Sequence, residues 1–395
     1  MSPDTLLLVT TSFPQSGDGS EAAGGFVADL AQALQAGGPV RVVAPGAQER
    51  LEALNGGVIV HRFAAPERPL SLLSPTRPAD WLAIASTLSS LRRQTLAAAH
   101  DGRVAHTLAL WALPSGWAAR ELQRRKGVPY SVWALGSDIW SLGRVPLVKR
   151  VLQSVISEAQ RRYADGLQLA TDARVLSGQA FEFLPSSRWL GRARARPMAT
   201  APPYRLLFLG RWHPNKGVDL LLEALALLPP DVWALVSDVR IAGGGPLEPA
   251  VRAQVAELLT RGLPVRLDGY LDNSAATDAL EAADFLLLPS RIESIPVIFS
   301  DAMKMKLPVL AMPVGDLPAL IEEGGVGHLA SAITSAAFAD CIAAALRQPP
   351  VRSATAIEAM SERFAVENSA NRLRHDLQLQ AQSSVLLPAG GVRYG

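Results

Sequence analysis

Short apolar runs that end at glycine or proline and lead straight into helical patterns recur along this chain of 395 residues. Residues 283–288 form such a run, closed by Pro289 and Ser290, and residues 204–209 form another, closed by Gly210. Continuous apolar strands of this kind are typical of parallel sheets that helices cover on both faces. Because strands and helices alternate in both halves, the sequence predicts an α/β fold.

Two carboxylates follow the strand at 283–288. Glu293 comes shortly after it, and Asp301 comes eight residues later, in the first turns of an expected helix. Ligands of open α/β sheets bind at the carboxyl ends of strands, so both acids are expected on one wall of a cleft. Carboxylates accept hydrogen bonds from hydroxyls, and the pair would suit a sugar joined to a ribose through phosphates. A charge pair at a helix start, without any ligand, explains the same pattern.

Two cations follow the strand at 204–209. Arg211 and Lys216 lie between Gly210 and a helical pattern that is expected to begin near Lys216. Free N–H groups at a helix start and nearby cations together attract phosphate. Solvated surface charge is the alternative for a basic pair in a loop.

A glycine run repeats this arrangement. Residues 239–242 form a short strand, Gly243, Gly244 and Gly245 follow it, and a helical stretch covers 248–260. Glycines let a backbone approach a phosphate or a base closely, and Gly244 is the predicted ligand contact. An ordinary turn between strand and helix explains the same residues.

The order and spacing of these motifs over more than a hundred residues resemble the donor half of family 4 retaining nucleotide-sugar glycosyltransferases. The resemblance implies a GT-B fold, in which two Rossmann-like domains face a central cleft. It also implies that Glu293 binds the donor sugar, that Asp301 binds ribose hydroxyls, and that Arg211 and Lys216 grip the diphosphate. Asp301 departs from the glutamate that is usual in the family.

The family also holds phosphate with backbone N–H groups that follow the first acid. In this chain the corresponding groups belong to Val297 and Ile298, while Pro296 lacks an N–H. The donor contacts expected in the C-terminal half are therefore Arg211, Lys216, Gly244, Glu293, Val297, Ile298 and Asp301.

The N-terminal half supplies further candidates. A loop at 12–25 contains Gly24 and Gly25 and is expected to open into a helix at 26–34. The resemblance places the two glycines at the cleft, whereas a flexible surface loop is the alternative. Residues 135–138 resemble the family's His-Gly-Ser-Asp segment, with Leu135 in place of the histidine and Asp138 as a candidate catalytic group. His106 is a second candidate for the cleft, although an isolated histidine among apolar residues is more often part of the core.

Chain length favours two domains. We expect an acceptor-side Rossmann-like domain at 1–190 and a nucleotide-sugar-binding domain at 191–369. The connection would lie in the stretch 185–203, which is rich in arginine, serine and proline. A helical segment at about 354–382 is expected to cross back, with residues of about 370–395 joining the first domain.

Composition excludes several classes of protein. The single cysteine and scattered histidines favour neither a disulfide framework nor a thiolate metal cluster, and no Asp-x-Asp occurs. We therefore expect no metal and no cofactor, with the nucleotide sugar acting as substrate. A net charge of +2 gives no case for nucleic acid. The absence of a secretory signal and of a membrane-spanning run predicts a soluble, cytoplasmic protein.

Two basic clusters suggest peripheral contact with an anionic membrane at its inner face. A solvated helix face is the alternative. The clusters are Arg120, Arg124, Arg125 and Lys126, on a helix expected to begin after Trp117, and Lys149 with Arg150.

The predicted function is transfer of a hexose-type sugar from a nucleotide diphosphate to a hydroxyl of a sugar or lipid-linked sugar, in surface polysaccharide or glycolipid synthesis. The resemblance alone implies retention at the anomeric carbon. A sugar-nucleotide epimerase or phosphorylase of the same fold, and a non-catalytic sugar-binding protein, are the alternatives.

Overall fold

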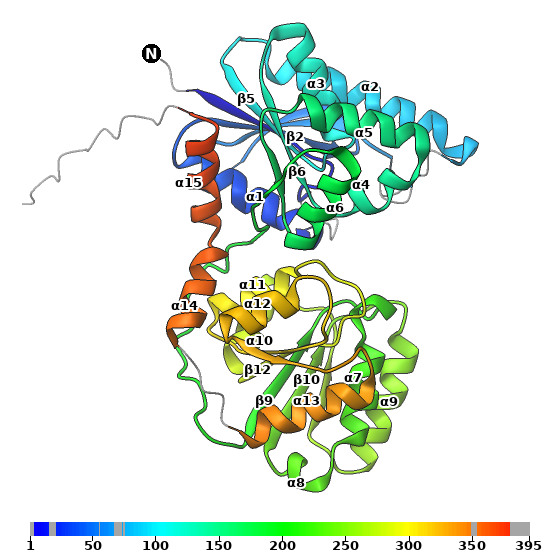
Figure 1. The fold of residues 1–395 in the computed structure, drawn as a ribbon, viewed down its shortest axis with the longest axis vertical. Helices are drawn as coiled ribbons and strands as arrows, with labels where there is room; N and C mark the ends of the chain where they lie inside the picture. Colours follow the sequence, from blue (N-terminus) through cyan, green and yellow to red (C-terminus); the bar gives the residue numbers. More distant parts are fainter. Residues whose placement is uncertain are drawn as a thin grey trace, which may run out of the picture.

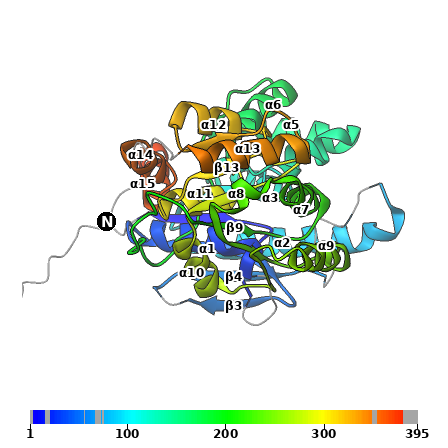
Figure 2. The same ribbon diagram turned by 90° about the horizontal axis from the view of Figure 1, so that it is seen from below.

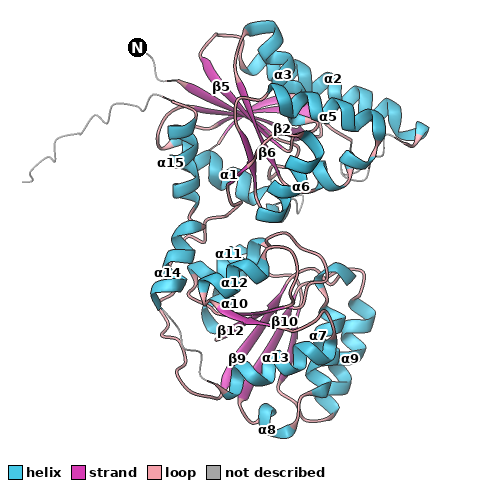
Figure 3. Ribbon diagram, viewed as in Figure 1, coloured by secondary structure: helices cyan, strands magenta, loops and turns pink. Residues whose placement is uncertain are grey.

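The computed structural model describes residues 4–15, 21–54, 56–66, 73, 76–348 and 354–379. These residues form two α/β bodies, one above the other, with the chain passing between them along one side (Figure 1). Strands lie inside each body and helices surround them (Figure 3). The predicted fold class is confirmed.

An eight-stranded sheet forms the core of the N-terminal domain, in the order β3-β4-β2-β1-β5-β6-β7-β8. All neighbours pair in parallel except β3 and β4. Its strands are β1 (Thr5–Val9), β2 (Val40–Gly46), β3 (Arg50–Ala53), β4 (Ile59–Ala64), β5 (Val104–Leu110), β6 (Tyr130–Ala134), β7 (Arg162–Ala164) and β8 (Glu182–Phe183). Its helices are α1 (Glu21–Gln35), α2 (Trp81–Ala98), α3 (Ser115–Lys126), α4 (Ser137–Trp140), α5 (Pro146–Glu158) and α6 (Leu167–Ser177), with short 3₁₀ turns η2 (Pro78–Asp80) and η3 (Leu142–Arg144).

A six-stranded parallel sheet forms the C-terminal domain, in the order β11-β10-β9-β12-β13-β14. Its strands are β9 (Tyr204–Leu209), β10 (Val236–Ala242), β11 (Val265–Asp268), β12 (Phe285–Leu288), β13 (Val309–Ala311) and β14 (Gly327–Leu329). Its helices are α7 (Val218–Leu227), α8 (Pro230–Trp233), α9 (Glu248–Thr260), α10 (Asn273–Ala282), α11 (Val297–Lys304), α12 (Leu317–Gly324) and α13 (Ser335–Arg347), with a 3₁₀ turn η4 (Pro214–Lys216).

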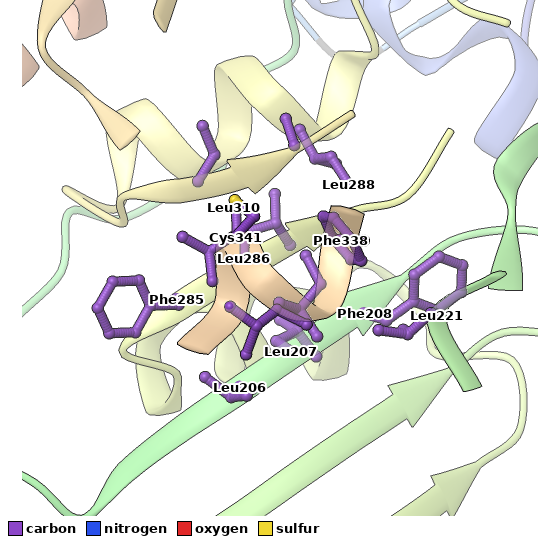
Figure 4. Close-up of a cluster of buried hydrophobic side chains, with 14 of the residues drawn as sticks. Leu206, Leu207, Phe208, Leu221, Phe285, Leu286, Leu288, Leu310, Phe338 and Cys341 are labelled. Carbon is purple, nitrogen blue, oxygen red and sulfur yellow. The ribbon is translucent and has the colours of Figure 1, made fainter. Parts of the chain in front are cut away.

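The apolar runs become strands because helices cover them. All four residues of β12 are buried, and they pack with β9 and with Phe338 and Cys341 of α13 (Figure 4). Burying a Leu or Phe side chain contributes roughly 1.5–3 kcal/mol each, which fixes these strands in the interior. The polar loops that follow them are left at the edge of the sheet.

The strand order of the second sheet reverses between β9 and β12. The chain runs from β9 outward through β10 to β11, then returns to β12 on the other side of β9. Loops that leave two adjacent strands in opposite directions open a crevice at their carboxyl ends, where ligands of such sheets bind. The loop bearing Lys216 follows β9 and the loop bearing Glu293 follows β12, so both border this crevice.

The two domains are joined twice. Strand β8 ends at Phe183 and β9 begins at Tyr204, so the expected boundary at 190–191 lies in this connection. The predicted single helix at 354–382 is instead two helices, α14 (Ala354–Arg363) and α15 (Val366–Asp376), because the backbone is extended at Ala365.

The second join is made by these two helices. Helix α14 packs on α11 and α12, whereas α15 packs on α1 of the N-terminal domain, and both helices lie at one edge of the molecule (Figure 2). Arg374 donates to the carbonyl oxygen of Leu34 (3.1 Å). Residues 380–395 of the segment expected to join the first domain lie outside the described part of the chain.

Candidate donor-binding site

A cavity of about 310 Å³ opens at the crevice between β9 and β12. Backbone and apolar side chains from the ends of both strands form its floor, and Lys216, Glu293, Val297 and Ile298 contribute to its walls. Four of the residues predicted to bind the donor therefore come together in one cavity. Arg211 and Gly244 lie in the neighbouring loops, and Asp301 points elsewhere.

Lys216 and Glu293 form an ion pair between Nζ and Oε1. Burial lowers the pKa of the Lys216 ammonium to about 8, and the charge of Arg211 acts in the same direction. The contacting carboxylate favours the charged form of the lysine. An ammonium that pairs with a carboxylate in this cavity is placed to bind a phosphate group there instead.

Glycine allows the two loops to meet. Gly217 has φ +68°, and a Cβ at this position would lie 1.9 Å from the carbonyl oxygen of Pro289. Any larger residue would both strain the backbone and push the Lys216 loop away from the Glu293 loop. Helix α7 begins at Val218, two residues later than predicted, because the 3₁₀ turn η4 takes up Pro214–Lys216.

Arg291 fastens the same two loops together. Its Nη1 and Nη2 donate to Oδ1 and Oδ2 of Asp219 (2.8 and 2.6 Å), in the first turn of α7. Nη1 also donates to the carbonyl oxygen of Pro214 (2.7 Å), and the Arg291 N–H donates to that of Asn215 (2.8 Å). Burial opposes ionisation of Asp219, but the hydrogen bonds and charge of Arg291 lower the pKa of its carboxyl below the ordinary value.

Sequence reasoning missed Arg291 and Asp219. The sequence did contain one indication of this ion pair. Asp219 and Arg291 carry opposite charges, and they follow the two strands that were expected to carry the ligand-binding loops. Their pairing depends on β9 and β12 being neighbours, which only the sheet order establishes.

The glycine run packs under the Arg211 loop. A Cβ at Gly243 would lie 1.9 Å from the carbonyl oxygen of Gly210, and one at Gly245 would lie 2.7 Å from that of Trp212. The Trp212 N–H donates to the carbonyl oxygen of Gly244 (2.8 Å). The close packing of these glycines places the loop with the exposed Arg211 beside the cavity. Gly244 contributes to this packing through its backbone hydrogen bond with Trp212.

Helix α11 begins at the cavity. No side chain in the described structure caps it at Pro296, and Val297 and Ile298, its first two residues, line the cavity. N–H groups of a first helical turn lack partners within the helix and carry partial positive charge. The helix start therefore adds to the attraction that Lys216 and Arg211 exert on an anion.

Asp301 does not share a wall with Glu293, so the predicted placement of its side chain is wrong. Its carboxylate is buried. Oδ2 accepts a hydrogen bond from Nε of Arg188 (2.8 Å), in the interdomain connection, and forms an ion pair with Nη2 of the same residue (2.7 Å). Burial raises the pKa of Asp301, while the charges of Arg188 and Lys304 oppose the shift. The helical rotation between the two acids turns Asp301 towards the interdomain connection. There its buried carboxylate pairs with the guanidinium of Arg188.

Asp138 is a structural residue rather than a candidate catalytic group. Its buried carboxylate accepts hydrogen bonds from the N–H groups of Ala112 (2.6 Å), Leu135 (3.3 Å) and Ile139 (3.1 Å). Burial raises its pKa to about 6, and these hydrogen bonds oppose the shift. The side chain joins the turns that follow β5 and β6.

His106 also lies away from the cleft. It is the third residue of β5, it is 2% exposed, and its Nε2 is hydrogen-bonded to Oγ of Ser131 (2.9 Å). Four residues of strand, roughly 13 Å, separate it from the carboxyl end at Leu110. Burial lowers its pKa to about 4, so the imidazole is a neutral core group.

Gly24 and Gly25 lie inside a helix, which corrects the expected loop. Helix α1 begins at Glu21 rather than at Phe26. A Cβ at Gly24 would lie 2.6 Å from the backbone of Phe13, so this glycine permits close packing of the helix. A Cβ at Gly25 would meet nothing within 4 Å.

The basic side chains of the first cluster, on α3, contact other groups of the N-terminal domain. Helix α3 begins at Ser115, before Trp117, and Arg120 is buried within it. Arg124 pairs with Glu158 (3.1 Å). Arg125 pairs with Glu121 and Lys126 donates to the carbonyl oxygen of Ala99 (2.9 Å). Lys149 and Arg150 of α5 are exposed.

Residues 203–348 match the family model described as Glycosyl transferases group 1. A phosphatidyl-myo-inositol mannosyltransferase of Mycobacterium leprae is 34% identical over 151 residues, which is 37% of this chain and 38% of that protein. A D-inositol 3-phosphate glycosyltransferase of Catenulispora acidiphila is 28% identical over 388 residues, covering 87% of each chain. The first of these matches thus spans less than half of the relative's length.

Solved structures show the same fold over nearly the whole chain. A sucrose-phosphate synthase from Thermosynechococcus elongatus superposes with a TM-score of 0.68 at 18% identity, covering 95% of this chain and 98% of its own. The Anabaena protein HepE in complex with UDP gives a TM-score of 0.67 at 17% identity, covering 95% and 99%. The C-terminal domain is thus similar to the group 1 glycosyltransferases, and the chain has the GT-B fold.

Proposed function

We propose that this protein moves a hexose-type sugar from a nucleotide diphosphate to a hydroxyl acceptor, with retention at the anomeric carbon. The observation that carries the proposal is the cavity in which Lys216, Glu293 and the start of α11 converge at the strand-order reversal. The lysine and the helix start suit a diphosphate, and the carboxylate beside them suits sugar hydroxyls.

The same groups would promote the reaction. As the bond between the anomeric carbon and the diphosphate breaks, negative charge grows on the leaving phosphate. The fold places Lys216 and the N–H groups of α11 at that point, and together with Arg211 they would stabilise the growing charge. When the donor replaces the carboxylate as the partner of Lys216, Glu293 becomes free to accept hydrogen bonds from the sugar.

The relatives support a role in building cell-surface glycans or glycolipids. They include a phosphatidyl-myo-inositol mannosyltransferase and a putative teichuronic acid biosynthesis glycosyltransferase of Bacillus subtilis, which is 27% identical over 70% of each chain. HepE has been solved with UDP-glucose. We propose a nucleotide sugar as donor and a sugar or lipid-linked sugar as acceptor, with no metal and no cofactor in the transfer.

The decisive experiment screens nucleotides by thermal shift and then measures transfer. Binding to the folded state raises the apparent melting temperature, so UDP, GDP and ADP and their sugars can be ranked directly. The best donor is then supplied with sugar and lipid-linked acceptors, and the anomeric configuration of the product is read by NMR. Absence of any stabilisation by nucleoside diphosphates would contradict the proposal, and an inverted product would contradict retention.

We also propose contact with an anionic membrane through α5, at the inner face of the membrane. Lys149 and Arg150 are exposed there beside Leu147 and Val151, which are 74% and 40% exposed. Leu147, Arg150 and Val151 lie on one face of the helix, and basic and apolar groups together suit an anionic lipid surface. Among the described helices none is long and apolar enough to cross a membrane. Cosedimentation with vesicles containing anionic lipid, lost when Lys149 and Arg150 are both changed to Glu, tests this contact.

A further inference from the structure

Asp316 connects the two domains beside the donor site. It lies in the loop between β13 and α12 of the C-terminal domain and is 4% exposed. Its Oδ2 accepts a hydrogen bond from the N–H of Leu167 (2.7 Å), and Oδ1 accepts one from Gln168 (2.8 Å). These are the first two residues of α6, which belongs to the N-terminal domain and faces the C-terminal domain in Figure 1.

Helix α6 is not capped by a side chain of its own first residues. Gly166 occupies the N-cap position and has no side chain to supply an acceptor. The free N–H groups of a helix start favour a negative charge, and here the carboxylate comes from the other domain, 149 residues away in the chain.

The same loop holds the main chain of the donor acid. The Asp316 N–H donates to the carbonyl oxygen of Ser294 (3.2 Å). Gly315 has φ +52°, and a Cβ there would lie 2.1 Å from the carbonyl oxygen of Glu293. Residues 315–316 therefore touch the backbone of Glu293 and Ser294 directly, on the side of that loop that faces the N-terminal domain.

The backbone of Gly166 in the N-terminal domain closely approaches Ser294 and Asp316 of the C-terminal domain. A Cβ at Gly166 would lie 2.1 Å from Oγ of Ser294 and 2.6 Å from Oδ2 of Asp316. The backbone of Gly166 is extended, with φ −145°, so alanine would fit its conformation. Only the contact across the domains requires glycine here.

We propose that Asp316 is an interdomain positioning residue, which clamps the loop bearing Glu293 against the start of α6 and thereby sets the donor acid relative to the acceptor-side domain. The inference rests on the proposed function, because it takes Glu293 to act on the transferred sugar. Nucleotide binding uses Lys216, Arg211 and α11, all within the C-terminal domain, and does not need the clamp. Transfer needs the donor acid and the acceptor-side domain to be held together.

Two variants break the clamp from opposite sides, and one control removes a similar cap elsewhere. Asp316→Asn removes the carboxylate charge, and Gly166→Ala obstructs the contact from the N-terminal domain. Asp272→Asn is the matched control, because Oδ1 of Asp272 caps α10 by accepting from the N–H of Ala275 (2.8 Å) within one domain. The full chain is used, and thermal melts confirm that each variant is folded.

Three measurements test the proposal. Small-angle X-ray scattering gives the radius of gyration without ligand, calorimetry gives Kd for whichever of UDP, GDP and ADP binds the wild type best, and initial rates give kcat. Both clamp variants should have a larger radius of gyration and a kcat about tenfold lower, as expected when charge-assisted hydrogen bonds are lost, with Kd within about twofold of wild type. The control should match wild type in all three.

An unchanged radius of gyration in both clamp variants, or a kcat equal to that of wild type, would overturn the proposal. So would a loss of nucleotide affinity as large as the loss of kcat, because that pattern indicates a damaged C-terminal domain. Failure of the proposed function is distinguishable, because then the wild type itself would neither bind a nucleoside diphosphate nor transfer a sugar, while the scattering comparison would still report on the clamp.

Discussion

Replacing Lys216 by alanine should weaken binding of a nucleoside diphosphate by about 10- to 150-fold. A charge-assisted hydrogen bond contributes roughly 1.5–3 kcal/mol, and each 1.4 kcal/mol is about a factor of ten in affinity. The ion pair with Glu293 is partly open to water, with 35% of the Lys216 side chain exposed. Its loss should therefore change the free energy of unfolding by less than about 1 kcal/mol.

The pKa of Lys216 adds a pH signature to this experiment. With a pKa of about 8, the ammonium is largely charged at pH 7 and largely neutral at pH 9. A bound diphosphate favours the charged form, so affinity should fall as pH rises through this range, by about tenfold between pH 7 and pH 9. Lys216→Arg keeps its charge over the whole range and should give a nearly flat profile.

Isothermal titration calorimetry at pH 7, 8 and 9 measures these effects for wild type, Lys216→Ala and Lys216→Arg. Arg252→Ala is a suitable control, because it removes a cation of the same domain that pairs with Glu248 on the exposed face of α9. Nucleoside without phosphate should bind all four proteins alike. Equal weakening of nucleoside and diphosphate in Lys216→Ala would refute the reasoning, because the lysine would then support the base or the fold. Unchanged diphosphate affinity would refute it as well.

The other predictions concern the two acids, the loop contact and metal. Glu293→Gln should lower kcat by tenfold or more, about 1.4 kcal/mol or more, yet leave diphosphate affinity nearly intact in calorimetry, and the reverse pattern would exchange the assigned roles. Asp301→Asn should lower the free energy of unfolding in urea by about 1–3 kcal/mol because Arg188 loses its carboxylate; unchanged stability with weakened nucleotide binding would favour the ribose role instead. Arg291→Ala and Asp219→Ala should each weaken diphosphate binding and show a coupling of roughly 1 kcal/mol in a double-mutant cycle, whereas strict additivity would mean that the pair does not position Lys216. Transfer should persist in excess chelator, and complete loss that added metal restores would contradict metal independence.

The local sequence determined the elements and the edge of the sheet at which the proposed donor site lies. Apolar runs predicted β9 and β12, and the expected helix at 248–260 is α9 with the same limits. Periodicity and turn residues act over a few residues, so they can be read without knowing the rest of the fold. Lys216 and Glu293 were predicted in this way to lie together, since each follows a strand whose carboxyl end was expected to face a ligand, and both line the same cavity.

Tertiary structure alone decided which polar groups face each other across long stretches of chain. Asp301 was expected in the cleft, yet it pairs with Arg188, 113 residues away. His106 looked like a cleft residue, yet the register of β5 and β6 buries it against Ser131. The clamp through Asp316 joins two domains. A charged or polar side chain carries no local signal for its partner, because the cost of burying it is offset only where the assembled fold supplies the matching group.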